Sequence, residues 1–293
     1  MKKRKSSNII IKLFFCLFSL CFVVPIIAVI GISLTEEKIL ISEGYKIWPQ
    51  KITWEAYAYI FANPKEILNA YKTTIIYSFF GTFLSVLVMS LMAYPLSRRD
   101  YTYRKPITFL VFFTMLFSGG LIPSYILNTA YLNLNNTIWI YIFPALASAW
   151  HIILIRTFFQ GVPLELAESA KIDGCSELRT FFQIMLPLSK PVIATVSFLI
   201  LLSKWNDWNT SLIYIKDSSL YSLQYLLQKI MDEAEFLKKT MEFAPSIALE
   251  NDSIPSESIK FAMCVVASGP MLVVFPFFQK YFSKGLTVGA IKG

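Results

Sequence analysis

The chain has 293 residues, of which 55% are hydrophobic and only 16% are charged, and its mean hydropathy is +0.55. A soluble domain carries about 25% charged residues, so this composition excludes an ordinary soluble enzyme and indicates a membrane protein. The net charge of +8 would suggest nucleic acid in a soluble protein, but here the basic residues lie between apolar runs, where the positive-inside rule accounts for them. We therefore expect membrane lipid, and no nucleic acid, around this chain.

Six apolar runs are long enough to cross a membrane. We expect spans at about residues 9–34, 72–97, 106–127, 137–159, 191–215 and 260–282. The first follows a basic N-terminus and is too long for a signal peptide, so we expect it to be retained. The third contains Gly119, Gly120 and Pro123, helix breakers that a span tolerates where protein or water satisfies the backbone. This span is expected to face neighbouring protein or a pathway, although simple packing explains the breakers equally well.

Charges in the loops orient the spans. The loop at 98–105 carries four basic residues and one acidic residue, so we place it, the loop at 160–190 and both termini in the cytoplasm. The loop at 216–259 is rich in acidic residues and is expected outside the cell. Its leucines recur at helical spacing near 221–231, which predicts a helix on the outer surface. The predicted fold is an all-α polytopic membrane protein, with a single transmembrane domain over residues 1–293.

The polar segment 160–190 is too long for a turn and too regular for a linker. Pro163 suits a first helical position, and Gly174 can end the helix by taking a left-handed backbone conformation. The residues expected to form one apolar face of this helix are Leu164, Leu166, Ala167, Ala170 and Ile172. A second helix is expected at about 176–185, before Pro187. Such an element could dock into a partner's groove or lie on lipid headgroups, and the residues alone leave both readings open.

The same segment carries a spaced motif. Glu168, Ser169 and Ala170 are followed by three residues and Gly174, and then by nine residues and the run at 184–187. This spacing resembles the E-A-A-x3-G-x9-I-x-L-P pattern of permeases in ABC importers, with Ser169 in place of the central alanine. The resemblance implies that the loop is a coupling helix, which seats in a cleft of a cytoplasmic ATPase. The implied ATPase-coupling residues are Glu168, Ser169, Ala170, Asp173, Gly174, Ile184, Leu186 and Pro187.

Other segments narrow the resemblance to the maltose-permease-like branch of carbohydrate permeases, and within it to the LplC and YtcP type of Gram-positive bacteria. They are residues 93–98, 119–123, 136–139, 205–208 and 279–293. The resemblance implies the ABC type I importer permease fold, a bacterial cell membrane location, and transport of an oligosaccharide or glycan. It also implies a second, non-identical permease, an ATPase dimer that binds ATP and Mg, and an extracellular solute-binding protein. Since the chain lacks G-x-x-x-x-G-K-[ST], we expect it to bind no cofactor itself.

A polar and aromatic patch interrupts the apolar fifth span after Lys204. Its members are Trp205, Asn206, Asp207, Trp208 and Asn209. Polar groups within a membrane usually face a bundle interior or a cavity, and indole rings with amides suit sugars, so we interpret the patch as lining a substrate pathway. Two alternatives stay open: the tryptophans could form an interfacial aromatic belt, and Lys204 and Asp207 could neutralise each other at i, i+3 spacing.

Two other functional classes remain for a six-span protein. A self-sufficient secondary carrier or channel would need coupling-ion ligands in its spans, and Lys204 and Asp207 are nearly the only candidates. A membrane enzyme would need paired carboxylates or a histidine cluster, and the single histidine, His151, can build neither such a cluster nor a metal site. The importer subunit, with no catalytic role of its own, is therefore the favoured reading.

Overall fold

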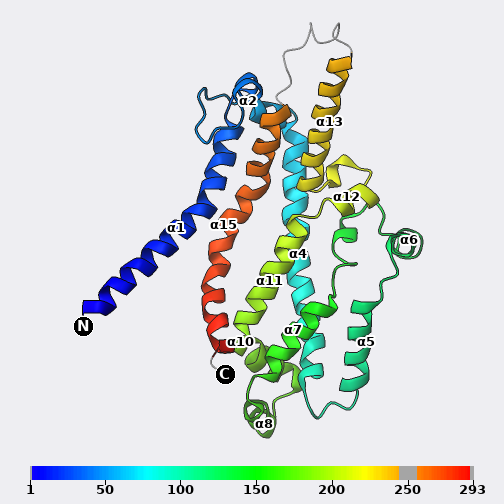
Figure 1. The fold of residues 1–293 in the computed structure, drawn as a ribbon. Helices are drawn as coiled ribbons and strands as arrows, with labels where there is room; N and C mark the ends of the chain where they lie inside the picture. Colours follow the sequence, from blue (N-terminus) through cyan, green and yellow to red (C-terminus); the bar gives the residue numbers. More distant parts are fainter. Residues whose placement is uncertain (1, 244–255, 291–293) are drawn as a thin grey trace. The chain divides into compact units, whose positions relative to one another are not determined.

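The described part of the chain is mostly helical, as the apolar sequence predicts. The computed structural model describes residues 2–243 and 256–290 (Figure 1), and within them an isolated bridge between Thr35 and Ile52 is the one piece of β structure. The chain divides into two compact units, which are described in turn. The first comprises Met1–Ile67 and Leu226–Pro270, and the second comprises Leu68–Tyr225 and Met271–Gly293.

The first unit combines the N-terminal helix with helices from late in the sequence. Its elements are α1 (Lys2–Ser33), α2 (Glu37–Glu43), α3 (Glu55–Ile60), the start of α4 (Pro64–Ser97), most of α13 (Leu223–Phe243) and the first part of α15 (Ser256–Ala290). After α1 the chain folds back on itself, because Thr53 donates its N–H to the carbonyl of Leu34 at 2.8 Å. The helix expected near 221–231 is therefore present as α13.

Glu37, in the first turn of α2, organises the start of α15. Its side chain is only 2% exposed. One carboxylate oxygen accepts the N–H of Glu257 at 2.9 Å and the other accepts the N–H of Ser258 at 3.0 Å. The hydroxyls of Ser256 and Ser258 donate to the same carboxylate at 3.3 and 3.2 Å. The first N–H groups of a helix have no partner within it, so Glu37 caps α15 from 220 residues earlier.

The second unit is built around α4, α7 and α11, which run alongside one another in Figure 1. Its elements after α4 are α5 (Arg104–Leu116), α6 (Leu121–Ile126), η1 (Leu127–Tyr131), η2 (Ile138–Tyr141), α7 (Ala149–Gln160), α8 (Leu164–Ile172), α9 (Glu177–Thr180), η3 (Phe181–Met185), α10 (Leu186–Leu188), α11 (Lys190–Trp205), α12 (Asn209–Tyr214) and η4 (Ser218–Leu220). The main core joins α4, α7, η3 and α11 around Ile155, Phe181 and Val196. A smaller core joins α4, η2 and α12 around Tyr77 and Tyr141.

Three helices of the described residues are long and apolar enough to cross a membrane. They are Ile11–Ser33, Pro64–Ser97 and Ser256–Lys280, which correspond to the expected first, second and sixth spans. Two bent pairs would raise the number to five if each pair is one span. These are Arg104–Leu116 with Leu121–Tyr131, bent by 113°, and Glu177–Leu188 with Lys190–Trp205, bent by 83°.

The expected third, fourth and fifth spans are not continuous helices. Gly120, with a φ of +84°, turns the chain between α5 and α6, a conformation that glycine adopts without strain. Between η2 and α7 the chain is irregular and contains Pro144, which has no N–H for a helical hydrogen bond. In the fifth segment α11 ends at Trp205 and α12 begins at Asn209.

Candidate functional site

The expected coupling segment folds as two helical pieces joined by a turn at Gly174. Gly174 has a φ of +75°, in the left-handed region. It donates its N–H to the carbonyl of Lys171 at 3.0 Å, and Cys175 donates to the carbonyl of Ala170 at 2.9 Å. These two bonds form a Schellman motif, which satisfies the last carbonyls of a helix. The prediction that Gly174 ends the first helix is confirmed.

Each of the two helical pieces begins at an identifiable N-cap residue. Pro163 caps α8 with an extended backbone (φ −53°, ψ 129°), so it precedes the helix rather than occupying the expected first helical position. The hydroxyl oxygen of Ser176 accepts the N–H of Arg179 at 3.3 Å and caps α9. The helix continues from α9 into the π-helical turn η3, which ends at Met185. The second helix expected at 176–185 is therefore confirmed.

The turn presents a mixed polar and apolar surface. Its exposed residues include Leu166, Glu168, Ser169, Ile172, Asp173 and Leu178. Ala167 and Ala170 are buried. The expected single apolar face is thus incorrect, because Ile172 is 86% exposed. It lies two residues after Ala170, which is about 200° around the helix. The side chain of Leu164 lies outside the described residues.

The last part of the motif, residues 184–187, lies beyond the exposed turn at Gly174. Ile184 and Leu186 are half-buried and Pro187 is exposed. They belong to η3 and α10, which lead into α11. Between them, Met185 is buried in the main core with Phe181. This run therefore links the exposed turn to the core of the second unit.

A chain of polar contacts ties the coupling segment to the end of α4. The buried Arg98 donates through Nε and Nη2 to the carboxylate of Asp100 at 3.2 and 3.1 Å. The ammonium of Lys171 lies 3.4 Å from Asp100 and 2.7 Å from Glu177. The hydroxyl of Tyr94 donates to Glu177 at 2.7 Å. We call these five residues the coupling relay.

The relay keeps its acids charged. The Arg98 guanidinium holds the pKa of Asp100 at about 2, below its ordinary value of 3.8. The hydrogen bond from Lys171 lowers the pKa of Glu177 in the same way. Sequence reasoning missed the relay because its contacts join residues 71 and 83 positions apart. From the sequence, the charges of the loop at 98–105 indicate only on which side of the membrane the loop lies.

The depressed pKa of Asp100 predicts a pH-dependent contribution to stability. The contribution is present above the ordinary pKa of 3.8 and is lost as pH falls through about 2. Because the Asp100 side chain is 59% exposed, solvent screening limits the effect of Asp100→Asn to about 1 kcal/mol. Thermal unfolding in detergent should show this difference at pH 6, and the difference should shrink as pH falls through 2. Asp173→Asn, which removes an exposed acid that is not part of the coupling relay, should show little difference at either pH.

The proposed pathway patch forms a break between helices. Trp205 is buried, whereas Asn206, Trp208 and Asn209 are exposed and Asp207 is half-buried. Asn206 is the C-terminal cap of α11, and Asp207 Oδ1 accepts the N–H of Thr210 at 3.0 Å in the first turn of α12. The five residues therefore do not share one helical face. Their role in a pathway stays a prediction.

Lys204 joins a buried polar cluster that sequence reasoning did not identify. Its side chain is 5% exposed, and its ammonium donates to the carbonyl of Tyr141 at 2.9 Å. Tyr77 donates its hydroxyl to the carbonyl of Lys204 at 3.0 Å, and the rings of Tyr77 and Tyr141 stack with centroids 4.3 Å apart. Within the described residues, Lys204 and Asp207 form no direct salt bridge, and Asp207 is instead hydrogen-bonded to the N–H of Thr210.

Gly81 leaves the space that Lys204 occupies. A β-carbon at Gly81 would lie 3.1 Å from both Nζ and Cε of Lys204, tighter than ordinary contact. Gly81→Val is expected to displace the ammonium and leave the Tyr141 carbonyl without its donor, at a cost of about 1–3 kcal/mol. Thermal unfolding in detergent measures this as a melting temperature several degrees lower. At Gly269 an added β-carbon meets nothing within 4 Å, so an equal shift for Gly269→Val would refute the explanation.

Comparison with known proteins gives matches over nearly the whole chain. The model of the family "Binding-protein-dependent transport system inner membrane component" matches residues 2–288. The polygalacturonan/rhamnogalacturonan transport system permease protein YtcP of Bacillus subtilis (strain 168) is 39% identical over 294 residues, which cover 99% of this chain and 100% of that relative. Protein LplC of the same strain is 38% identical over 271 residues, which cover 92% of this chain and 90% of that relative.

A solved structure is also similar. It is the crystal structure of a bacterial ABC transporter involved in the import of the acidic polysaccharide alginate. The matched chain has a TM-score of 0.76 and 28% sequence identity, and the match covers 96% of this chain and 98% of that chain. The resemblance to ABC importer permeases, and to the LplC and YtcP type among them, is thus confirmed.

Proposed function

We propose that this chain, which belongs to the family of binding-protein-dependent transport system inner membrane components, carries a sugar across a bacterial cell membrane. The sugar we propose is an oligosaccharide or glycan. The chain is a permease subunit of an ABC importer. Two relatives are named for acidic polysaccharides, polygalacturonan/rhamnogalacturonan and alginate. Oligosaccharides that contain uronic acids are therefore the first substrate class to test.

The observation that carries the mechanism is the exposed turn at Gly174. The segment exposes the apolar side chains of Leu166 and Ile172 on α8 and of Leu178 on α9, together with the carboxylate of Glu168, and the coupling relay ties it to the unit. A helical segment with exposed apolar side chains and exposed acids suits the groove of a partner. We propose that this surface seats in a cytoplasmic ATPase, which alone binds ATP and Mg, and that Glu168 accepts hydrogen bonds there.

The proposed mechanism is alternating access, in which the partner proteins bind the inward-facing and outward-facing states of the permease with different affinities. Closure of the ATPase dimer would push on α8, and the coupling relay would pass the displacement to the end of α4. A loaded extracellular binding protein would favour the outward-facing state, and this preference would couple substrate to ATP hydrolysis. In this scheme α13, within the loop at 216–259, helps to receive the binding protein. The part of that loop at 244–255 lies outside the described residues.

The same proposal assigns the topology and the second permease. We place both termini and the loop at 160–190 in the cytoplasm, as the loop charges favour, and count the broken segments among six spans. α5 and α6 contain no buried residue within this chain, which supports a covering partner or lipid on that face. A second, non-identical permease would complete the pathway, with the residues at 205–209 lining it. The Bacillus relatives favour a Gram-positive cell.

Affinity purification tests the assembly. The chain is extracted from its native membrane in mild detergent, and bound proteins are identified by mass spectrometry. We expect a second permease and a P-loop ATPase to copurify. Recovery of this chain alone, together with solute uptake by liposomes that contain only this chain, would contradict the proposal and favour a self-sufficient carrier.

Uptake by the reconstituted importer tests the substrate class. Labelled oligogalacturonides and neutral oligosaccharides of matched length are offered to proteoliposomes with the binding protein outside and ATP inside. We expect ATP-dependent uptake of the acidic sugars. Uptake of neutral sugars alone would keep the importer assignment and overturn the acidic class.

A further inference from the structure

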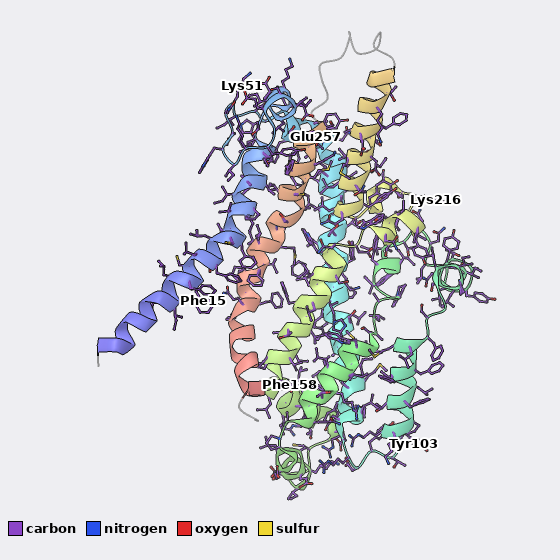
Figure 2. All side chains as sticks on the ribbon, in the orientation of Figure 1. Phe15, Lys51, Tyr103, Phe158, Lys216 and Glu257 are labelled. Atoms are coloured by element: carbon purple, nitrogen blue, oxygen red, sulfur yellow. The ribbon has the colours of Figure 1, made fainter. Side chains whose placement is uncertain are left out.

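A cavity of about 810 Å³ lies between the start of α5 and the end of α7. Tyr103 and Phe158, labelled in Figure 2, mark this end of the second unit, whereas Lys216 marks the opposite end. Four of the lining residues are basic: Arg99, Arg104, Lys105 and Arg156. Three come from the segment that begins α5, and the fourth comes from α7.

Within the described residues, no salt bridge neutralises the four basic residues of this cavity. Asp100, the one acidic residue in the lining, is already engaged by Arg98 and Lys171. Arg156 donates through Nε to the carbonyl of Leu96 at 2.9 Å. With the amide of Gln160, which lies outside the lining, oriented by its hydrogen bonds, its oxygen accepts from Arg104 at 2.8 Å and from Arg156 at 3.3 Å. Two guanidinium groups thus converge on one neutral oxygen. Like charges at this distance repel, and a bound anion would relieve the repulsion.

The wall next to these charges is apolar. Phe109 and Phe112 of α5 line the cavity and are 64% and 48% exposed, and Ile153 of α7 lines it as well. Phe109 follows Lys105 by one helical turn, so charge and aromatic surface lie one above the other. Thr108, between them, has a hydroxyl that is buried without a hydrogen-bond partner in the described residues. The cavity therefore offers cations at one end and an apolar side.

We propose that this cavity binds one anionic phospholipid, with its phosphate on Arg104 and Arg156 and an acyl chain along Phe109 and Phe112. Basic cavities between membrane helices bind acidic lipid headgroups in this way. The positive-inside rule accounts for basic residues in a loop. It does not account for guanidinium groups from two helices that meet at one amide beside an exposed aromatic wall. The proposal does not depend on which sugar is carried.

Native mass spectrometry tests the site on the full chain in detergent. The protein is incubated with equal amounts of phosphatidylglycerol and phosphatidylcholine of the same acyl length, and retained lipid is counted. We expect one phosphatidylglycerol to be retained preferentially. The double variant Arg104→Gln with Arg156→Gln should lower that preference about thirtyfold, since each basic residue contributes a factor of about five.

Two matched variants make the result specific. Arg104→Lys with Arg156→Lys keeps the charges and should keep most of the preference, which also shows that the fold tolerates substitution. Arg179→Gln with Lys190→Gln removes two exposed charges that do not line this cavity, and should have no effect. An equal loss in this control, or no preference in the unmodified chain, would overturn the lipid site.

Two further outcomes would reassign the cavity. If glycerol phosphate without acyl chains displaces the lipid at equal concentration, the cavity binds a soluble phosphate and the lipid assignment fails. If phosphatidylglycerol is retained by the isolated chain and lost when the ATPase assembles, the surface belongs to that protein contact. Retention in both states supports the lipid.

Discussion

Gly174→Val should lower binding-protein-stimulated ATP hydrolysis of the assembled importer by about tenfold or more. A side chain at a φ of +75° is strained, and the strain costs about 1–2 kcal/mol, more for a β-branched residue. An added β-carbon at this position meets nothing within 4 Å, so the effect is one of backbone conformation and not of a clash. Loss of the Schellman turn would let α8 change its angle to α9. The measurement is ATPase rate with and without loaded binding protein, in proteoliposomes.

Two control variants test whether backbone strain at Gly174, and not a general loss of stability, lowers ATP hydrolysis. Gly174→Asn should be much milder, because asparagine tolerates the left-handed conformation. Gly44 also has a positive φ, +77°, with open space around it, but lies between α2 and α3. Gly44→Val should therefore leave the stimulation of ATP hydrolysis nearly unchanged. If Asn and Val at Gly174 are equally damaging, backbone strain is not the cause.

Glu37→Ala should lower the free energy of unfolding by about 3 kcal/mol. The substitution removes the acceptor of two backbone N–H groups and two hydroxyls at the start of α15. A buried donor that loses its partner costs about 1–3 kcal/mol, and bonds to a charged group are the stronger ones. The start of α15 should fray first. Thermal unfolding and hydrogen exchange at residues 256–260 measure the two effects.

Glu36 offers a neighbouring control of the same residue type. Its carboxylate pairs with Lys51 at 2.7 Å, and the Lys51 side chain is 69% exposed. A solvent-exposed pair of this kind contributes little to stability, so Glu36→Ala should change the free energy of unfolding little. Glu37→Gln keeps one acceptor oxygen, so its loss in the free energy of unfolding should lie between those of Glu36→Ala and Glu37→Ala. Equal losses for Glu36→Ala and Glu37→Ala would show that the cap contributes nothing beyond a surface charge.

The sequence predicts the parts of this protein that depend on local chemistry. Gly174 was identified as a helix stop because glycine alone adopts a left-handed backbone without strain, and the turn is there. Gly119 and Gly120 were identified as breakers, but periodicity could not show that the bend between α5 and α6 reaches 113°. The polar residues after Trp205 are a local signal, but they indicated a pathway lining within one helix and not that α11 ends at Trp205.

Contacts between distant residues were beyond such reasoning. The i, i+3 spacing of Lys204 and Asp207 allows them to pair, as one of the alternatives, but it does not predict that the ammonium of Lys204 donates to the carbonyl of Tyr141, 63 residues away. Arg98 and Asp100 were counted as loop charges and not as one end of the coupling relay. Tertiary packing decides which of several equivalent partners a side chain contacts. A single sequence does not predict that choice.

The cap on α15 also bears on how the protein is made. Glu37 is synthesised 220 residues before Glu257, whose N–H it accepts. Until residues 256–258 are made, the carboxylate has no helix end to bind and must stay hydrated. Burial of Glu37 therefore has to wait for their synthesis, and we expect a chain truncated before residue 256 to leave this acid exposed to solvent.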